Sequence, residues 1–300
     1  MSSAGASAAR GRLLIVTAAV LWSLSGMFTR VLREPTSLGL NEPALEPLQI
    51  AAGRVLFAGL AMLPLLRAGD ISFRPLMAAT AVVFASMNAM FIAAMALGSA
   101  ANAILLQYTA PFWLYLAGVW LLREPASRRG AVSVVIGMCG IGCIIWGGWQ
   151  GEQGLIVLLG LGSGLTYALV LIGLRLQREA SPVWLTAVNH LTGALALLPF
   201  VWHLGWPSWP QIGWLALFGT VQMGVPYLLM ARGLRSVDPA EAGTLTLLEP
   251  LLNPFWAYLV APERERPTVY VLLGGSCILL ALVYRYWPWT SGRARPTTSE

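Results

Sequence analysis

Lysine is absent from this sequence, and charged residues of all kinds make up only 11% of its 300 residues. A typical soluble domain carries roughly 25% charged residues. Because 57% of the residues here are hydrophobic, a soluble protein would be unable to cover its surface with polar groups. The composition therefore excludes one or two soluble domains and predicts an all-α polytopic membrane protein.

Histidine and cysteine are also scarce, with two and three residues. Cys139, Cys143 and Cys277 all fall inside apolar runs, where we interpret them as packing residues rather than metal ligands. The arginines behind the net charge of +6 lie in short loops between apolar runs, which is typical of membrane topology and not of nucleic-acid binding. We expect no metal, no cofactor and no nucleic-acid partner. The expected partners are the lipid bilayer and a small-molecule substrate.

Long apolar runs dominate what is present. A helix needs about twenty mostly apolar residues to cross a bilayer. We predict ten transmembrane helices, at approximately residues 13–32, 47–66, 75–97, 101–122, 130–149, 154–174, 182–203, 210–231, 240–260 and 267–288. The polar tail at 291–300 is expected to be disordered and cytoplasmic.

The nineteen basic residues, all of them arginine, are distributed unevenly about these spans. Fourteen lie on the side where the chain begins, and only Arg30, Arg33, Arg264 and Arg266 lie on the other. Basic loop residues gather on the cytoplasmic side of membrane proteins. We therefore expect a multi-pass protein of the bacterial inner membrane with both termini in the cytoplasm. The remaining arginine, Arg54, lies within the second span.

Two stretches of the sequence, 102–124 and 241–263, resemble each other. Each begins with small residues, holds a proline near its middle and ends in glutamate. Two pairs match at a spacing of 139 positions, Pro111 with Pro250 and Glu124 with Glu263. A repeat unit of nearly half the chain indicates two joined copies of one domain.

The predicted domains are therefore two five-helix repeats, residues 1–150 and 151–290. Because five is an odd number of crossings, the second copy must enter the membrane from the opposite side. The predicted fold is ten transmembrane helices arranged as two inverted repeats. Such repeats place the substrate site at their interface, near the middle of the bilayer.

Charged and titratable groups inside the spans are few. Glu249 is the only carboxylate clearly within a span, and it has three possible roles: binding a substrate ammonium, taking up a proton, or pairing with Arg54. Arg54 is suited to hold a substrate carboxylate or to extend toward the membrane surface. His190 is a possible proton relay or simply a packed side chain. These three residues are the candidates for proton or charge coupling.

Neutral polar and aromatic side chains supply the rest of the predicted cavity. With Glu249 the predicted lining comprises Trp22, Asn88, Gln107, Tyr108, Trp113, Tyr167, Gln222, Tyr227, Asn253 and Trp256. Prolines inside spans free a carbonyl one turn earlier and kink the helix. We expect kinks at Pro111, Pro226, Pro250 and Pro254, either around a polar cleft or as packing features.

Several motifs carry a resemblance to a known family. They are W-S-x-x-G from Trp22 to Gly26, Arg54 early in the second span, and LLQYTAP paired with LTLLEP in the fourth and ninth spans. With these motifs the sequence resembles the drug/metabolite transporter superfamily, and within it the EamA-type exporters, most of all those that export amino acids. The glycine that usually precedes the closing glutamate is replaced by Arg123 in one repeat and by Pro262 in the other.

The resemblance implies a transporter and not an enzyme. It implies a central cavity lined by the third, fourth, eighth and ninth spans, with the first, second, sixth and seventh as moving gates. The fifth and tenth spans would pack at the periphery, in a monomer or a homodimer.

We expect an exporter of small metabolites that works by alternating access. A sparse polar lining with several aromatics suits a zwitterion, so neutral, hydrophobic or aromatic amino acids are the predicted substrates. Other solutes of the same superfamily, namely drugs, purines or nucleotide-sugars, are the alternative. An intramembrane enzyme is a remote alternative, because Ser276 and His190 make a poor nucleophile and base pair.

Overall fold

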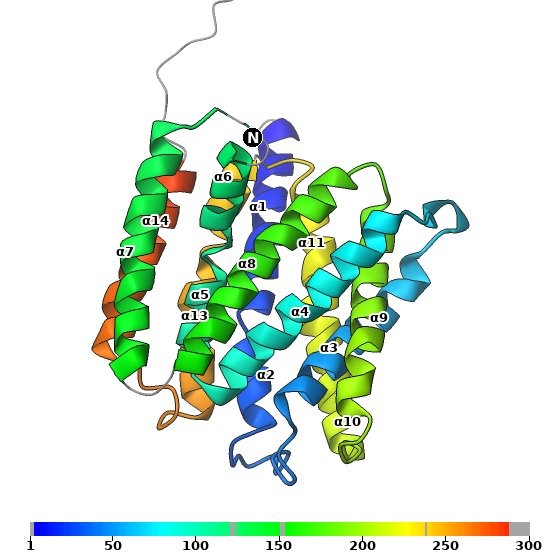
Figure 1. The fold of residues 1–300 in the computed structure, drawn as a ribbon. Coiled ribbons are helices and arrows are strands. Elements are labelled where there is room, and N and C mark those ends of the chain that lie inside the picture. The colour runs from blue at the N-terminus through cyan, green and yellow to red at the C-terminus, as the bar shows by residue number, and fades with distance from the viewer. Residues whose placement is uncertain (1–2, 121–122, 124, 151–153, 238, 288–300) are drawn as a thin grey trace, which may run out of the picture.

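The structure is a computed structural model that describes residues 3–120, 123, 125–150, 154–237 and 239–287. The predicted tail at 291–300 and Glu124 lie outside these residues. Every regular element in the described part is helical (Figure 1). The first half contains α1 (Ser3–Trp22), α2 (Ser25–Val31), α3 (Pro47–Met62), α4 (Pro75–Leu97), α5 (Ala100–Gln107), α6 (Ala110–Trp120) and α7 (Arg128–Gln150), with short 3-10 turns at Leu63–Leu65 and Ala68–Asp70.

The second half repeats this order with its own interruptions. It contains α8 (Gly154–Leu176), α9 (Pro182–Val201), α10 (Trp209–Leu217), the π-helix η3 (Phe218–Gly224), α11 (Val225–Gly233), α12 (Pro239–Leu245), α13 (Leu248–Val260) and α14 (Val269–Tyr286). Eight helical stretches of the described residues are long and apolar enough to cross a membrane. The other two predicted spans, the fourth and ninth, are present as broken pairs, α5 with α6 and α12 with α13.

The two breaks fall at matching places in the repeats. α5 ends at Gln107 and α6 begins at Ala110, while α12 ends at Leu245 and α13 begins at Leu248. Pro111 and Pro250 follow each break within the first turns of α6 and α13. A proline donates no backbone hydrogen bond and is tolerated at the start of a helix but not in its middle. Kinks were expected at these prolines, and the structure has a two-residue interruption of the helix just before each of them.

The helix contacts form pairs related by an internal twofold axis. α7 packs along α14 and α3 along α9, and in both pairs the partners occupy equivalent places in the two repeats. α4 packs on α8 as α11 packs on α1, and α5 packs on α8 as α13 packs on α2. This pairing is what two inverted five-helix repeats require, and it confirms the predicted fold.

The pair α7 and α14 shows the inversion directly. Arg129 at the start of α7 donates a hydrogen bond to the carbonyl of Tyr284 at the end of α14, so the two helices run antiparallel. A Cβ on Gly140 would lie 2.5 Å from the Gly274 carbonyl oxygen, and a Cβ on Gly274 would lie 2.5 Å from that of Gly140. Small residues allow this close, reciprocal approach of two membrane helices.

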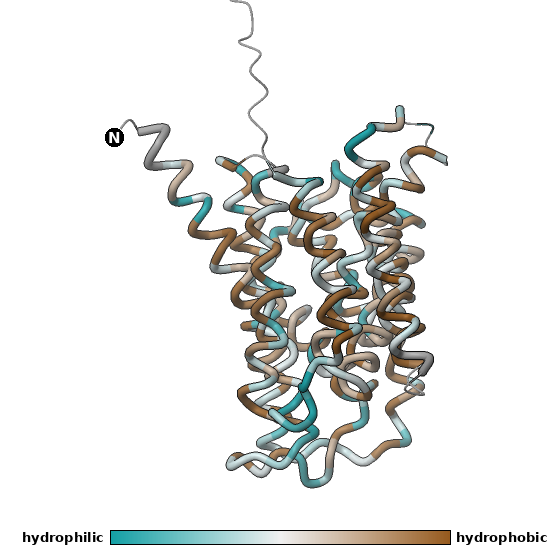
Figure 2. The backbone as a smooth tube through the Cα atoms, turned by 90° about the vertical axis from the view of Figure 1, so that its left-hand side faces the viewer, coloured by the Kyte–Doolittle hydropathy of each residue, from teal (hydrophilic) through white to brown (hydrophobic). Residues whose placement is uncertain are grey.

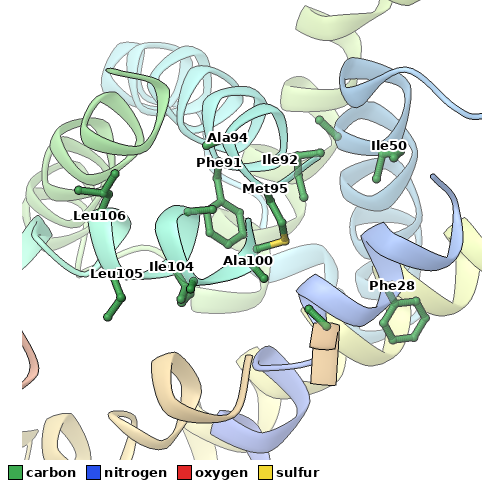
Figure 3. Close-up of a cluster of buried hydrophobic side chains, with 14 of the residues drawn as sticks. Phe28, Ile50, Phe91, Ile92, Ala94, Met95, Ala100, Ile104, Leu105 and Leu106 are labelled. Atoms are coloured by element: carbon green, nitrogen blue, oxygen red, sulfur yellow. The ribbon is translucent and has the colours of Figure 1, made fainter. Parts of the chain in front are cut away.

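Apolar side chains cover the outside of the bundle and also fill its interior. Figure 2 shows hydrophobic residues along the helices and hydrophilic residues mostly in the loops and helix ends above and below. Inside, one cluster joins α2, α3, α4 and α5, and Figure 3 shows Phe91 and Met95 of α4 beside Ala100 and Ile104 of α5. This cluster anchors the half-helix α5 so that its end, Gln107, points into the middle of the bundle.

Candidate substrate cavity

A cavity of about 230 Å³ lies where the two repeats meet. It is bounded by the end of α1, by α3, α4, α8, η3 and α11, and by both helix breaks. It extends from Trp22 and Tyr108 in the middle of the bundle to Met230, Gly243 and Tyr286. Those three residues lie at the end of the bundle where α1 begins and α14 ends, as the ion pair between Arg12 and Glu241 also shows.

Most of the predicted polar lining meets in this cavity. The predicted residues that line it are Trp22, Arg54, Gln107, Tyr108, Pro111, Tyr167, Gln222, Tyr227 and Glu249. They come from both repeats and from both helix breaks. The remaining candidates, Asn88, Trp113, His190, Pro226, Pro250, Asn253, Pro254 and Trp256, do not line it.

Arg54 extends into the cavity from α3, and its exposed fraction is only 3%. Its Nε donates to Asn88 Oδ1 over 2.7 Å, and Asn88 in turn donates to the Ala51 carbonyl. The guanidinium carbon lies 5.5 Å from the ring centre of Phe91 and 5.4 Å from that of Phe218. No described residue accepts a hydrogen bond from Nη1. Arg54 is thus held rigidly by neutral partners while part of its donor fork stays unused.

Glu249 enters from the opposite side, in the first turn of α13. The Tyr108 hydroxyl lies 2.8 Å from Glu249 Oε2 and 3.0 Å from the Thr246 carbonyl oxygen. Both helix breaks therefore contribute to one hydrogen-bonded group. Within the described part of the chain, no ion pair joins Glu249 to Arg54, so the cavity keeps one cation and one carboxylate apart.

Gln222 adds a neutral acceptor to this wall. It lies in η3, and its Nε2 donates to the Trp22 carbonyl over 2.8 Å. Its Oε1 is buried and accepts no hydrogen bond from any residue that the structure describes. The backbone of η3 approaches α3 closely, because a Cβ on Gly219 would lie 2.3 Å from the Arg54 carbonyl oxygen. This contact places Gln222 and Arg54 against the same space.

The candidates outside the cavity make hydrogen bonds elsewhere, either between helices or within one helix. Asn253 donates to Ser25 Oγ over 2.6 Å, and Trp256 Nε1 donates to Ser23 Oγ over 3.0 Å, so both fasten α13 to the break between α1 and α2. Trp113 donates to Thr109 within its own repeat. His190 Nδ1 lies 2.7 Å from the Thr186 carbonyl, and its ring packs against Phe84 and Tyr227.

Pro226 lies at the start of α11, directly after the π-helical stretch η3. Because proline has no backbone N–H, Pro226 donates no hydrogen bond to the Gln222 carbonyl one turn earlier. π-Helical turns inside α-helices are frequent at functional sites. Pro254 lies within α13, about two turns after the break.

Sequence reasoning missed the apolar half of the wall. It consists of Met87, Phe91, Leu171, Met223, Leu247 and Met230. Such residues carry no signal in a membrane sequence, where apolar side chains are everywhere. Thr246 and Tyr286 were also missed. Pro250 is the one sequence feature that points to Thr246, because a proline frees a backbone carbonyl about one turn earlier and leaves it to be satisfied in a cavity.

The opposite end of the bundle is closed by a second buried arginine. Arg30, at the end of α2, is fully buried and donates from Nε to Glu265 Oε1 over 2.5 Å. Its Nη2 donates to the carbonyls of Met95 and Gly98, and Glu265 also accepts the backbone N–H of Ala100. These bonds tie α2, the α4–α5 turn and the α13–α14 loop into one plug.

A larger hollow of about 610 Å³ lies between α3, α9 and α10. Its lining is apolar apart from Gln49, and it includes the exposed side chains of Leu195, Trp202 and Trp206. An apolar surface of this kind suits contact with lipid, and it offers no charged group to a solute. In the described residues no three His, Cys, Asp or Glu side chains gather as a metal site requires.

Comparisons with known proteins agree with this arrangement. The model of the EamA-like transporter family matches residues 9–146 and again residues 154–286. An uncharacterized transporter of Archaeoglobus fulgidus is 29% identical over 278 residues, which cover 91% of this chain and 95% of that protein. The uncharacterized transporter YwfM of Bacillus subtilis is 29% identical over 174 residues, covering 57% of this chain and 51% of its own length. The fold is similar to that of a protein of known crystal structure, with a TM-score of 0.60 and 16% sequence identity. The match covers 92% of this chain and 96% of that protein's chain.

Proposed function

Because this chain belongs to the EamA-like transporter family, we propose that it exports small zwitterionic metabolites, above all neutral, hydrophobic or aromatic amino acids. The observation that carries the proposal is an arginine and a carboxyl side chain that line one cavity without forming an ion pair with each other. Arg54 has an unused donor for a carboxylate, and Glu249 has an acceptor for an ammonium. An amino acid supplies both groups and brings no net charge.

The size of the cavity favours a small solute over the alternatives. Sites for drug-sized ligands measure roughly 300–1,000 Å³, and this cavity holds about 230 Å³. A nucleotide-sugar would also bring several negative charges, whereas Arg54 is the only cation among the lining residues of the described cavity. The methionines and Phe91 offer an adaptable apolar wall, which suits loose selectivity among apolar side chains.

The two ends of the cavity are compatible with the proposed direction of transport. The open end lies on the side to which the arginine bias assigns the cytoplasm, and the Arg30 plug closes the other side. Substrate would enter from the cytoplasm of a bacterial cell, and the repeats would then exchange shapes and release it outward. This is alternating access in the direction of export.

Counterflow in proteoliposomes tests the proposal. Vesicles loaded with one unlabelled solute are supplied with a trace of the same solute labelled, and accumulation is measured for amino acids, a purine, a cationic drug and a nucleotide-sugar. We expect accumulation only with amino acids, and least with those whose side chains are charged. Accumulation of the purine, drug or nucleotide-sugar without amino acids would overturn the substrate class.

A further inference from the structure

A second pocket, of about 260 Å³, lies at the closed end of the bundle. It is bounded by the turn between α4 and α5, by the loop between α13 and α14, and by the first turn of α14. The α4–α5 turn also belongs to the plug, because its Gly98 carbonyl accepts a hydrogen bond from Arg30. The pocket therefore lies directly against the plug that closes this end of the bundle.

The inverted repeats relate this pocket to the open mouth of the central cavity. That mouth is formed by the end of α11, by α12 and by the end of α14. Their counterparts in the first repeat are the end of α4, α5 and the end of α7. The pocket is bounded by the first two of these and by the start of α14. The start of α14 packs on the end of α7, since a Cβ on Gly147 would lie 2.5 Å from the Tyr270 Cβ. An exchange of shapes between the repeats would thus open an outer mouth at this pocket.

The charges of the pocket favour an anionic group. Arg264 and Arg266 line it, against the single carboxylate of Glu263. In the described structure these arginines contact the Leu97 carbonyl, Glu34 and Glu263. A guanidinium carries five N–H donors, so both arginines keep donors for a ligand. α5 and α14 also begin at this pocket, and helix N-termini attract negative charge.

Asn102 adds a requirement for a hydrogen-bond donor. It lines the pocket with an exposed fraction of 6%, and no described residue donates to its Oδ1. Its backbone N–H is bonded to Ser99 Oγ, so the unpaired group belongs to the side chain. A buried acceptor without a donor calls for an explanation, and a bound ligand supplies one. The ligand therefore needs an anionic group for the arginines and a donor for Asn102, which excludes chloride.

Resting on the proposed function, we propose that this pocket is a second binding site for the exported zwitterion, on the outer side of the plug. Arg264 and Arg266 bind the carboxylate of the solute. Asn102 Oδ1 and Glu263 accept hydrogen bonds from its ammonium. The volumes of about 260 and 230 Å³ are similar, so one solute fits both the pocket and the central cavity. External solute that occupies the pocket slows export.

Equilibrium dialysis of the purified protein against labelled L-leucine tests the proposal. We expect two leucines bound per chain at saturation in the wild type, and one in Arg54→Ala, which loses the central site. Asn102→Leu replaces the unpaired amide with an apolar side chain of similar size. It should bind one leucine and unfold at no lower temperature than the wild type, because a buried acceptor without a donor is removed.

Two arginine variants check that the second leucine binds in this pocket. Arg266→Ala removes an exposed side chain of the lining and should weaken the second site at least tenfold. Arg33→Gln is the matched control, since it removes a positive charge near the same end of the bundle but outside the pocket. It should bind two leucines, as the wild type does.

The outcomes separate this site from the proposed function. A single leucine per chain that only Arg54→Ala removes would overturn the outer site and leave the proposed function intact. If no leucine bound the wild type, the outer site would also fail, and counterflow would decide the proposed function separately. Glycerophosphoethanolamine, a soluble phospholipid headgroup, carries the same pair of charges. Its binding in place of leucine, lost in Asn102→Leu, would assign the pocket to lipid and overturn the proposal.

Discussion

Arg30 and Arg54 are both buried in the bundle, and their surroundings differ in a way that separates structure from function. Arg30 bonds a buried carboxylate and several backbone carbonyls at the closed end. Arg54 bonds one side-chain amide, lies against two aromatic rings and keeps a nitrogen without a partner in the described structure. A buried polar group left unpaired is costly, so the unpaired nitrogen of Arg54 supports the proposal that a substrate carboxylate binds there.

The largest effect on stability is expected from removing Arg30, whose hydrogen-bond donors have partners. Arg30→Ala leaves Glu265 charged and buried without its partner, which typically costs about 3–5 kcal/mol. Thermal unfolding in detergent should show a large drop in midpoint for Arg30→Ala. The matched control is Arg266→Ala, which breaks an exposed ion pair with Glu263 and should change stability by at most about 1 kcal/mol. Equal effects of the two variants would contradict the role of the plug.

Removing Arg54, which has an unpaired donor, should reduce transport more than it reduces stability. Arg54→Ala removes the hydrogen bond that we propose to the substrate carboxylate, and a hydrogen bond to a charged group is worth about 1.5–3 kcal/mol. We expect the half-saturating amino-acid concentration in counterflow to rise by at least tenfold. Arg54→Lys keeps the charge but loses the planar fork, and it should recover only part of the affinity. Wild-type affinity in Arg54→Ala would show that the substrate carboxylate binds elsewhere.

A smaller effect is expected from the residue that positions Arg54. Asn88→Ala leaves the Arg54 Nε without its acceptor, with a cost of about 1–3 kcal/mol divided between stability and binding. Transport should weaken less than in Arg54→Ala, and the double variant should be no worse than Arg54→Ala alone. Additive losses in this cycle would indicate that Asn88 contacts the substrate itself.

Arg123 adds a comparison of backbone conformation to the comparison of side-chain contacts. Arg123 is exposed and has a φ of 54°, in the left-handed region that glycine adopts without strain. At this position the resembled family usually carries glycine. Arg123→Gly should therefore raise stability by about 1 kcal/mol. A fall in the unfolding midpoint would show that the arginine side chain contributes more than its backbone costs.

The sequence predicted the layout of the molecule well and the roles of single side chains less well. The ten apolar runs predicted the ten spans, and the two prolines at a fixed spacing predicted the repeats. Both predictions succeed because hydrophobicity and proline determine helix structure through the residues nearby in the sequence. Arg30 was expected only as one of the few outer arginines, and its burial depends on Glu265, 235 positions away. Asn253 and Trp256 were expected in the cavity and fasten helices instead. Such pairings arise from tertiary packing and leave no local pattern.

The central claim is that Arg54 and Glu249 together recognise a zwitterion. The most direct measurement compares counterflow of L-leucine with that of its amide, which lacks the carboxylate, and of its deaminated acid, which lacks the ammonium. All three share one apolar side chain, so only the charged ends differ. We predict strong accumulation of leucine and at least tenfold less of either analogue. Equal accumulation of all three would contradict the account.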